Sequence, residues 1–398
     1  MNKLTIDDLS LSNKRVLVRV DFNVPLTPDG MVADDLRIRA ALPTIKKIIS
    51  SGGFPVLMSH LGRPKGERKS EFSLQPVAQC LTGLLGSPVK FASDCVGTDV
   101  EEQSRLLEPG ETLLLENLRF HIEETKNDPA FAEKLSKLGD VYVNDAFGTA
   151  HRAHASTEGV TKFFDQCAAG YLMEKELQYL IGALSNPARP FVAILGGAKI
   201  SGKIEVIKNL FDKVDSILIG GAMTFTFFKA MGYEVGDSLL EEDRVEMAGE
   251  VLAKAKAKNV ELTLPVDIVV SNAADGSGEI RTVPFDGIPA GLKGLDIGEV
   301  SITRFEKILS GAKTVVWNGP MGLFEVDKFA TGTYRIAKIL ADITGRGAVT
   351  IVGGGDSASA VAKSGLQDRM THISTGGGAS LELLEGKPLP GLAALSDK

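Results

Sequence analysis

The chain has 398 residues, a formal net charge of -7, 43% hydrophobic residues and 43 glycines. This length suits two or three domains with sizeable cores, and the composition is typical of an α/β enzyme rather than of a fibrous or disordered protein. The acidic balance argues against nucleic acid as a partner, although a few converging basic side chains could still bind a small anion.

The cysteines and the N-terminus exclude several further classes of protein. Cys80, Cys95 and Cys167 have no metal-ligand spacing, so neither a disulfide framework nor a zinc site is expected. The first residues lack the apolar segment of an export signal, and no run approaches 18 apolar residues. We therefore expect a cytoplasmic protein without a membrane partner.

The first half of the chain alternates strand-like and helix-like segments. Apolar runs predict strands at residues 15–23, 54–60, 89–92, 111–120 and 141–147. Helical spacing predicts helices at residues 36–49, after Asp34 or Asp35, and at 72–85 and 129–138.

Polar residues follow most of these strands, at the edge where ligands bind in doubly wound parallel sheets. The side chains expected to face one cleft there are Asp21, Asn23, His60, Arg63, Arg119 and Arg152.

Residues 171–185 form a helix-like stretch that ends before Pro187. We interpret it as a connector between domains, with a hinge at its ends. The alternative is a plain surface helix of the first domain.

The second half repeats the alternation. Strands are predicted at residues 191–197, 216–223, 266–271, 314–321 and 348–356, with helices at 204–211, 241–258, 301–309 and 328–343. The expected architecture is α/β, with two Rossmann-like doubly wound parallel-sheet domains joined by a hinge helix. The expected domains are residues 1–170 and 186–388.

Four arginines of the first half, Arg37, Arg63, Arg119 and Arg152, each follow a strand or begin a helix. Guanidinium groups bind phosphate or carboxylate oxygens with two parallel hydrogen bonds. A single arginine is most often a solvated surface residue, but the shared location and the neighbouring His60 favour an anion site.

Residues 195–204, LGGAKISGKI, predict a phosphate site in the second half. Glycines let backbone N–H groups approach an anion, the following helix adds its dipole, and Lys199 and Lys203 add charge. Ile204 stands where a P-loop has Ser or Thr, so the site is not a P-loop. Taken alone, the segment could also be an ordinary strand-to-helix turn with two solvated lysines.

Further glycine-rich turns occur at residues 220–221, 353–355 and 376–378, and the last two precede helix-like runs. Their N–H groups and helix dipoles could point at phosphates. Asp356 could hold a hydrated Mg2+ through one carboxylate, or it could simply cap the helix that begins near Ser357.

Eight motifs together resemble phosphoglycerate kinase. They are RVDFNVP (19–25), SHLGRP (59–64), ENLRF (116–120), NDAFGTAHRAHAS (144–156), LGGAKISGKI (195–204), WNGPMGLFE (317–325), GGGDS (353–357) and STGGGASLELLEGKPLPG (374–391). The resemblance runs from the first strand to the C-terminal tail, in the order and length of the family.

The resemblance implies two binding sites. The first domain would bind 3-phosphoglycerate or 1,3-bisphosphoglycerate through Asp21, Phe22, Asn23, Arg37, His60, Leu61, Gly62, Arg63, Arg119 and Arg152. The second would bind ATP or ADP through Gly196, Gly197, Lys199, Lys203, Gly220, Gly294, Asn318, Glu325, Gly354, Gly355, Asp356 and Ser357, with Asp356 on Mg2+. The tail from about residue 389 to 398 would pack back on the first domain.

Two positions depart from the pattern of the family. Gly202 stands where the family usually has Asp, and Ser357 where it usually has Thr. We expect an adjusted nucleotide affinity rather than a loss of activity.

The implied reaction is the reversible, in-line phosphoryl transfer of glycolysis between 1,3-bisphosphoglycerate and ADP, after domain closure. The carboxylate acceptor of the reverse direction is already ionised, so no general base is needed. The requirement is charge cancellation on the transferring group, which we assign to Arg37, Lys199 and the N–H groups of Gly376, Gly377 and Gly378. Lys203 and Mg2+ would act on the nucleotide phosphates.

Two other functional classes agree less well with the sequence. An NAD-dependent dehydrogenase would need G-x-G-x-x-G after a strand and an acidic residue about 20 positions later, and no glycine cluster here fits. A two-domain anion-binding protein would explain the arginines but not the lysines and glycines of the second half. A monomer is the default expectation.

Overall fold

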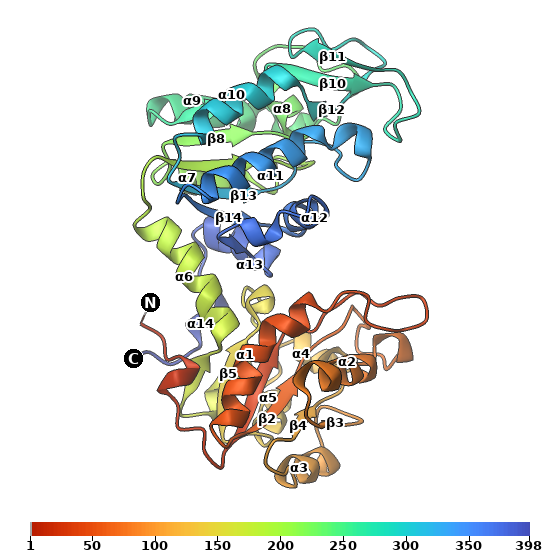
Figure 1. Ribbon diagram of the computed structural model, residues 1–398, viewed down its shortest axis with the longest axis vertical. Coiled ribbons are helices and arrows are strands. Elements are labelled where there is room, and N and C mark those ends of the chain that lie inside the picture. The colour runs from red at the N-terminus through yellow and green to blue at the C-terminus, as the bar shows by residue number, and fades with distance from the viewer. Residues whose placement is uncertain (1) are drawn as a thin grey trace. The chain divides into compact units, whose positions relative to one another are not determined.

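The computed structural model describes residues 2–398, which divide into two compact units (Figure 1). Of the described residues, the first unit takes residues 2–178 with Pro388–Lys398, and the second is Tyr179–Lys387. The dividing point lies inside helix α6 (Tyr171–Ser185). The C-terminal segment is bound to the first unit by backbone hydrogen bonds, from Gly391 N to Ala150 O (2.8 Å) and from Leu4 N to Ser396 O (2.8 Å).

The first unit is built on a six-stranded parallel sheet with the order β3-β4-β2-β1-β5-β6. The strands are β1 (Arg15–Val20), β2 (Phe54–Met58), β3 (Val89–Phe91), β4 (Thr112–Leu114), β5 (Val141–Asp145) and β6 (Cys167–Ala169). The helices are α1 (Leu36–Ser50), α2 (Gln75–Leu85), α3 (Thr98–Arg105), α4 (Ile122–Thr125), α5 (Pro129–Ser136) and α14 (Pro390–Ala393).

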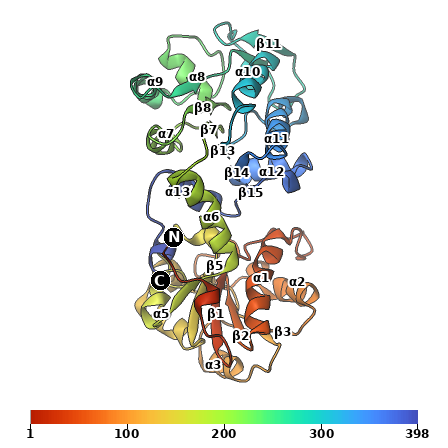
Figure 2. The ribbon, with the colours of Figure 1, turned by 60° about the vertical axis from the view of Figure 1, so that its left-hand side comes forward.

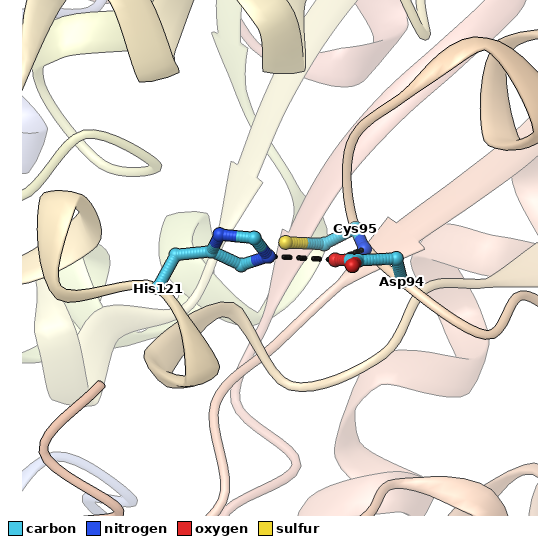
Figure 3. Close-up of side chains that lie close together, drawn as sticks. All are labelled: Asp94, Cys95 and His121. Atoms are coloured by element: carbon cyan, nitrogen blue, oxygen red, sulfur yellow. Dashed lines mark hydrogen bonds and ion pairs between the residues drawn. The ribbon is translucent and has the colours of Figure 1, made fainter. Parts of the chain in front are cut away.

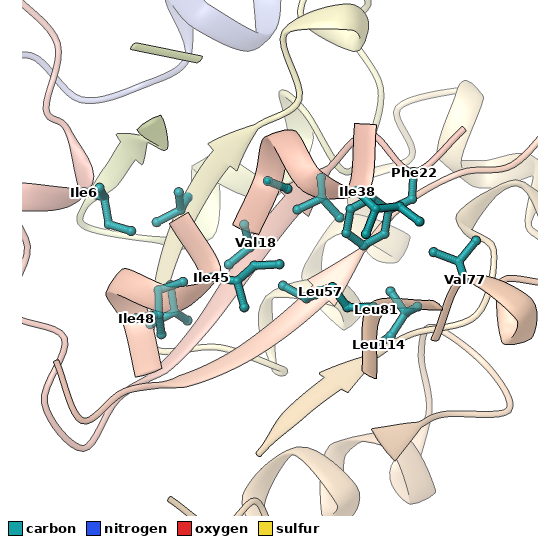
Figure 4. Close-up of a cluster of buried hydrophobic side chains, with 14 of the residues drawn as sticks. Ile6, Val18, Phe22, Ile38, Ile45, Ile48, Leu57, Val77, Leu81 and Leu114 are labelled. Carbon is teal, nitrogen blue, oxygen red and sulfur yellow. The ribbon is translucent and has the colours of Figure 1, made fainter. Parts of the chain in front are cut away.

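One face of this sheet is covered by α1 and α2, whose apolar residues are spaced at helical intervals. Ile38, Ile45 and Ile48 of α1 belong to one buried cluster with Val18 of β1 and Leu81 of α2 (Figure 4). Because successive side chains of a strand point to opposite faces, Val18 faces this core and Arg19 faces away from it.

The second unit contains another six-stranded parallel sheet, with the order β15-β14-β13-β7-β8-β9. Its strands are β7 (Phe191–Leu195), β8 (Ser216–Ile219), β9 (Glu261–Thr263), β13 (Thr314–Asn318), β14 (Val349–Gly353) and β15 (His372–Ile373). The helices are α7 (Ile204–Leu210), α8 (Met223–Ala230), α9 (Val245–Ala257), α10 (Glu299–Leu309), α11 (Thr331–Thr344), α12 (Gly355–Lys363) and α13 (Gly377–Leu384).

Helices cover both faces of this second sheet (Figure 2). The helices α10 and α11 contribute Phe305 and Ile336 to a core that also contains Trp317 of β13. Trp317 is fully buried and donates its Nε1–H to the carbonyl of Gly319 (2.7 Å). The expected α/β class, with one doubly wound parallel sheet in each unit, is confirmed.

Residues 266–271 form a strand as predicted, but not a strand of the parallel sheet. Strand β10 (Asp267–Ser271) lies in a separate antiparallel sheet between β11 (Ile280–Pro284) and β12 (Lys293–Ile297). The prediction missed this sheet because β11 is mostly exposed and has no continuous apolar run.

Several predicted strands are too long at their C-terminal ends. The segment 111–120 is a strand only at Thr112–Leu114 and becomes a 3-10 helix at Leu118–Phe120. Likewise β8 ends at Ile219. In both cases the pairing with neighbouring strands stops before the segment ends, at Leu114 and at Ile219, although an apolar residue still follows each point in the sequence, Leu115 directly and Ala222 after two glycines.

None of the helices within residues 2–398 combines the length and apolar character that crossing a bilayer demands.

Asp296 of β12 gives the second unit a testable pH dependence. Its carboxylate is buried and accepts hydrogen bonds from Gly332 N (2.7 Å) and Ile297 N (2.9 Å). Burial raises its pKa to about 7, against the opposing effect of these hydrogen bonds. The folded state therefore keeps a proton that an unfolded Asp releases near pH 4, so the free energy of unfolding falls as pH rises from about 4 to 7.

We expect Asp296→Asn to flatten this pH slope and to lower stability overall, because one N–H loses its acceptor. Denaturant unfolding at pH 4 to 8, followed by the fluorescence of the single tryptophan, reports on the second unit. Asp286→Asn, at an exposed position, is the matched control and should keep the wild-type slope. An unchanged slope in Asp296→Asn would contradict the assignment.

Candidate active site

The first unit concentrates positive charge around His60, which follows β2. The pKa of His60 lies well below its ordinary value because the ring is buried and because the charges of Arg19, Arg119, Arg152 and Arg37 disfavour protonation. Burial, Arg19, Arg152 and Arg63 likewise lower the pKa of Arg119 to about 10, against the opposing charge of Glu124. We call Arg19, Arg37, Arg63, Arg119 and Arg152 the arginine cluster.

His60 is a neutral hydrogen-bond donor within the arginine cluster. Its Nδ1 lies 3.2 Å from Nη2 of Arg19. Because a guanidinium can only donate, Nδ1 must be the acceptor, and the ring proton is therefore on Nε2. The imidazole therefore has an N–H to donate and adds no sixth positive charge to the cluster.

Arg19 is a member of the cluster that the sequence analysis did not select. It is fully buried, and it donates from Nε to Ser156 Oγ (2.8 Å) and from Nη1 to the carbonyl of Val20. Ser156 in turn donates from N (2.9 Å) and Oγ (2.6 Å) to the carboxylate of Glu124. The only available signal was the alternation along β1, which places a charged residue between two core valines.

Arg37 and Arg119 are held by groups that follow the strands. Arg37 donates from Nη1 to Asp21 Oδ2 (3.0 Å) and to the carbonyl of Asn23 (3.2 Å). Arg119 donates from Nη1 to the carbonyl of Gly62 (2.8 Å), and Gly62 N donates to Asn23 Oδ1 (2.9 Å). These bonds join the strand ends into one framework that carries both guanidinium groups.

The other predicted substrate-binding residues of the first unit differ in how far their side chains are exposed to solvent. Phe22 and Leu61 belong to the core beneath α1 and α2, so only their backbone atoms are available to a ligand. Arg63 is exposed. Arg152 donates from Nε to His151 Nε2 (3.1 Å), which gives this arginine a fixed neighbour.

In the second unit, glycine turns meet at the carboxyl ends of the parallel strands. Gly196 N donates to Asn318 O (3.0 Å), Gly197 N donates to Pro320 O (2.9 Å), and Gly221 N donates to Met321 O (2.9 Å). Gly196 has no room for a side chain, since an added Cβ would stand 2.1 Å from Pro320 O. The turns after β7, β8 and β13 are therefore in backbone contact.

The third predicted turn, residues 376–378, approaches the turn after β14. An added Cβ on Gly377 would stand 3.1 Å from Gly354 Cα. The helices α12 and α13 begin at Gly355 and Gly377, so their free N–H groups start close together.

Lys203 lies among these turns, and its Nζ donates to Asn318 Oδ1. Burial lowers the pKa of Lys203 to about 8, against the opposing charges of Asp356 and Glu385. An anion bound beside the lysine would favour its charged form.

The other predicted residues of the second unit have varied surroundings. Ser357 is buried and its Oγ accepts from Gly319 N (2.6 Å), whereas Asp356, Lys199 and Glu325 are exposed. Gly220 and Gly294 both lie against side chains, since an added Cβ would meet Met321 Sδ at 2.4 Å and Phe225 Cζ at 2.1 Å respectively.

Glu241 is a supporting residue that sequence reasoning missed. Its carboxylate accepts from Ser201 N (3.1 Å) and Ser201 Oγ (2.6 Å), which ties down the loop between Lys199 and Lys203. A glutamate 40 positions from the loop gives no local sequence signal.

Comparisons with known proteins agree with this geometry. A model of the family described as phosphoglycerate kinase matches residues 6–387. A phosphoglycerate kinase of Chlorobaculum tepidum is 60% identical over 397 residues and one of Prosthecochloris aestuarii is 58% identical over 397 residues, in each case over 100% of both chains.

Two solved structures have the same fold. The phosphoglycerate kinase of Coxiella burnetii superposes with a TM-score of 0.88 at 40% identity, and that of Pyrococcus horikoshii with a TM-score of 0.85 at 35% identity. Each covers 98% of this chain and of its own.

Two of the three glycines in the 195–204 segment, Gly196 and Gly202, should differ in how far they tolerate an added methyl group. Gly196→Ala places Cβ against backbone oxygens that cannot move independently, so we expect a loss of about 1 to 3 kcal/mol in the stability of the second unit. Gly202→Ala, with nothing within 4 Å of the added Cβ, should stay within about 0.5 kcal/mol of wild type. Unfolding followed by Trp317 fluorescence measures both, and equal stabilities would contradict the close contact.

Proposed function

This chain belongs to the phosphoglycerate kinase family, and from that membership we propose which of its residues carry the reaction. The enzyme transfers a phosphoryl group reversibly between 1,3-bisphosphoglycerate and ADP, to give 3-phosphoglycerate and ATP, as a step of glycolysis. The observation that carries the assignment of residues is the accumulation of arginine charge around the neutral, buried His60.

The arginine cluster binds the phosphoglycerate. Its substrate carries a phosphate and a carboxylate or acyl phosphate, which are the groups that guanidiniums bind with paired hydrogen bonds. The charges around His60 disfavour one another until an anion joins them, so binding of a polyanion relieves their repulsion. The carbonyl of Gly62, which Asn23 holds in place, accepts from the guanidinium of Arg119, and the carboxylate of Asp21 accepts from that of Arg37.

The glycine turns of the second unit bind the nucleotide. Backbone N–H groups at the start of α12 and α13, together with Lys203, suit the phosphates of ATP or ADP. The partly buried Lys203, whose pKa of about 8 reflects desolvation, regains full charge when a phosphate lies beside it.

Transfer itself requires charge cancellation rather than proton transfer. The carboxylate acceptor of 3-phosphoglycerate is ionised at neutral pH, so it attacks without a general base. Arg37, Lys199 and the N–H groups of Gly376, Gly377 and Gly378 would stabilise the charge on the equatorial oxygens of the transferring group. Because Arg37 belongs to one unit and Lys199 to the other, a domain closure is part of the proposal.

Mg2+ fits the donor set at the start of α12. Asp356 offers an exposed carboxylate in the first turn of this helix, and its charge reaches Lys203, as the pKa of that lysine indicates. One carboxylate with nucleotide phosphates and water is a usual ligand set for Mg2+. When bound, the ion would neutralise phosphate charge, while Lys203 and the glycine N–H groups orient the nucleotide.

We further propose that the protein acts as a monomer in the cytoplasm, on freely diffusing substrates and without nucleic acid. Both sites are built from residues of this one chain, and sedimentation velocity would measure its mass in solution.

Arg37→Ala and Lys199→Ala should each lower kcat by about 10^2 to 10^3, the usual cost of one preorganised donor. If both groups act on the same phosphoryl group, the double variant loses less than the product of the two single losses. Steady-state kinetics in both directions, with circular dichroism to verify folding, measure these effects.

Matched controls lie on the helix of Arg37 and on the helix that follows the loop of Lys199. Arg39→Ala removes an exposed arginine of α1 that is paired with Asp35, and Lys208→Ala removes a lysine of α7 paired with Glu205. Both should keep more than half of the wild-type kcat. Arg37→Ala or Lys199→Ala retaining that much would refute the assigned role.

Asp356→Asn should raise the Mg2+ concentration needed for half-maximal rate by at least about ten-fold, because the ion loses its protein carboxylate. The KM for 3-phosphoglycerate should stay unchanged, since that substrate binds in the other unit. Titration of activity with Mg2+ at saturating ATP measures the shift. Asp327→Asn, which changes another exposed carboxylate of this unit, serves as control. An equal shift of the required Mg2+ concentration in both variants would refute the role of Asp356 as the Mg2+ ligand.

A further inference from the structure

Three metal-ligating side chains of different chemistry meet at the edge of the sheet in the first unit. They are Asp94, Cys95 and His121, and their ligand atoms all lie within 4.8 Å of one another (Figure 3). His121 Nε2 stands 2.7 Å from Asp94 Oδ1, and Figure 3 shows the Cys95 sulfur beside both groups. The phosphoryl transfer described above uses none of the three.

Two loops of the sheet bring these residues together. Asp94 and Cys95 follow β3. The residue directly after this strand, Ala92, still pairs with the neighbouring strand β4, since its N–H donates to the carbonyl of Leu114 (3.0 Å). His121 follows the 3-10 helix Leu118–Phe120 and directly precedes α4. Its ring also lies against Phe131, with ring centroids 5.2 Å apart, so the imidazole is supported on one side.

We propose that Asp94, Cys95 and His121 bind a borderline divalent cation, with Zn2+ as the best match. Thiolate, imidazole and carboxylate are the three ligand types that zinc accepts in proteins, commonly three at a time with water in the fourth position. A thiolate and an imidazole do not suit Mg2+, which takes oxygen ligands, so this site is distinct in chemistry from the one at Asp356.

Access and charge both fit a bound cation. Cys95 is fully buried, whereas the side chains of His121 and Asp94 are 28% and 39% exposed. Solvent therefore reaches the cluster on the side where a water ligand would complete the tetrahedron. One carboxylate and one thiolate balance the two positive charges of the ion. When the metal binds, the Cys95 thiol loses its proton to solvent. The neutral His121 ring gives up its hydrogen bond to Asp94 and carries its proton on Nδ1, which frees Nε2 for the metal.

Two existing contacts of Asp94 bear on this site. Its Oδ1 accepts from Cys95 N (2.7 Å), and its Oδ2 lies 3.6 Å from Arg68 Nη2. The first contact fixes the carboxylate beside the cysteine. In the second contact Arg68 lies beside Oδ2. The other carboxylate oxygen, Oδ1, is the one that faces His121 and Cys95.

The test uses the full-length protein after treatment with a chelator and removal of that chelator. Zn2+ is titrated in competition with a chromophoric chelator, in excess Mg2+ so that oxygen-only sites are occupied. Co2+ is added in a parallel experiment, because a cobalt–thiolate bond gives a charge-transfer band that reports the cysteine directly. We expect one Zn2+ per chain and a cobalt–thiolate band.

Variants separate this site from adventitious binding. Cys95→Ser should abolish the band and weaken Zn2+ binding by at least about ten-fold. His121→Gln, at a partly exposed position, should weaken Zn2+ binding to a similar extent, and it provides the test if Cys95→Ser does not fold. Cys167→Ser, at another buried free cysteine, should change neither. A stoichiometry far below one, or a band that survives Cys95→Ser, overturns the proposal and leaves Asp94 and His121 as a structural ion pair.

Discussion

Like-charge repulsion among buried or partly buried guanidiniums is the constraint on which the first unit depends. Arg19, Arg119 and Arg152 all act on the same imidazole, and none of them can lose its proton at physiological pH. An unpaired buried charge costs several kcal/mol, so the fold must hold these groups by other means until a ligand arrives.

The compensation comes from one buried carboxylate and from the ends of the strands. Glu124 is fully buried, accepts two hydrogen bonds from Ser156 and so reaches Arg19 through that serine. Burial raises the pKa of Glu124, and the charge of Arg19 opposes the rise. The carboxylates of Glu124 and of Asp21, which pairs with Arg37, cannot balance five arginines, so a net positive charge is left for the proposed anionic substrate.

The second unit solves a similar problem with backbone groups. The phosphates of a bound nucleotide would contact N–H groups of the glycine turns and the partly desolvated Lys203. Little charge therefore has to be buried in the free protein. The cost is steric instead: Gly196 must stay without a side chain because backbone oxygens fill the space, and Gly377 leaves only a tight fit for one. The proposed zinc ligands Asp94, Cys95 and His121 belong to the first unit, where His121 directly follows the 3-10 helix that carries Arg119.

The sequence by itself determined the two parallel sheets, and it indicated the strand ends as the place of the proposed sites, because continuous apolar strands followed by polar residues are a local pattern. It also indicated Arg37, Arg119 and Lys203, since each stands next to such a strand or turn. The alternation along β1 marked Arg19 only as a charged residue between core valines and did not identify its partners. Glu124, Glu241 and His121 gave no local signal, because their partners lie 26 to 40 positions away along the chain. Only the tertiary structure decided these, because contact between residues distant in sequence depends on the order of strands in the sheet, which no local pattern encodes.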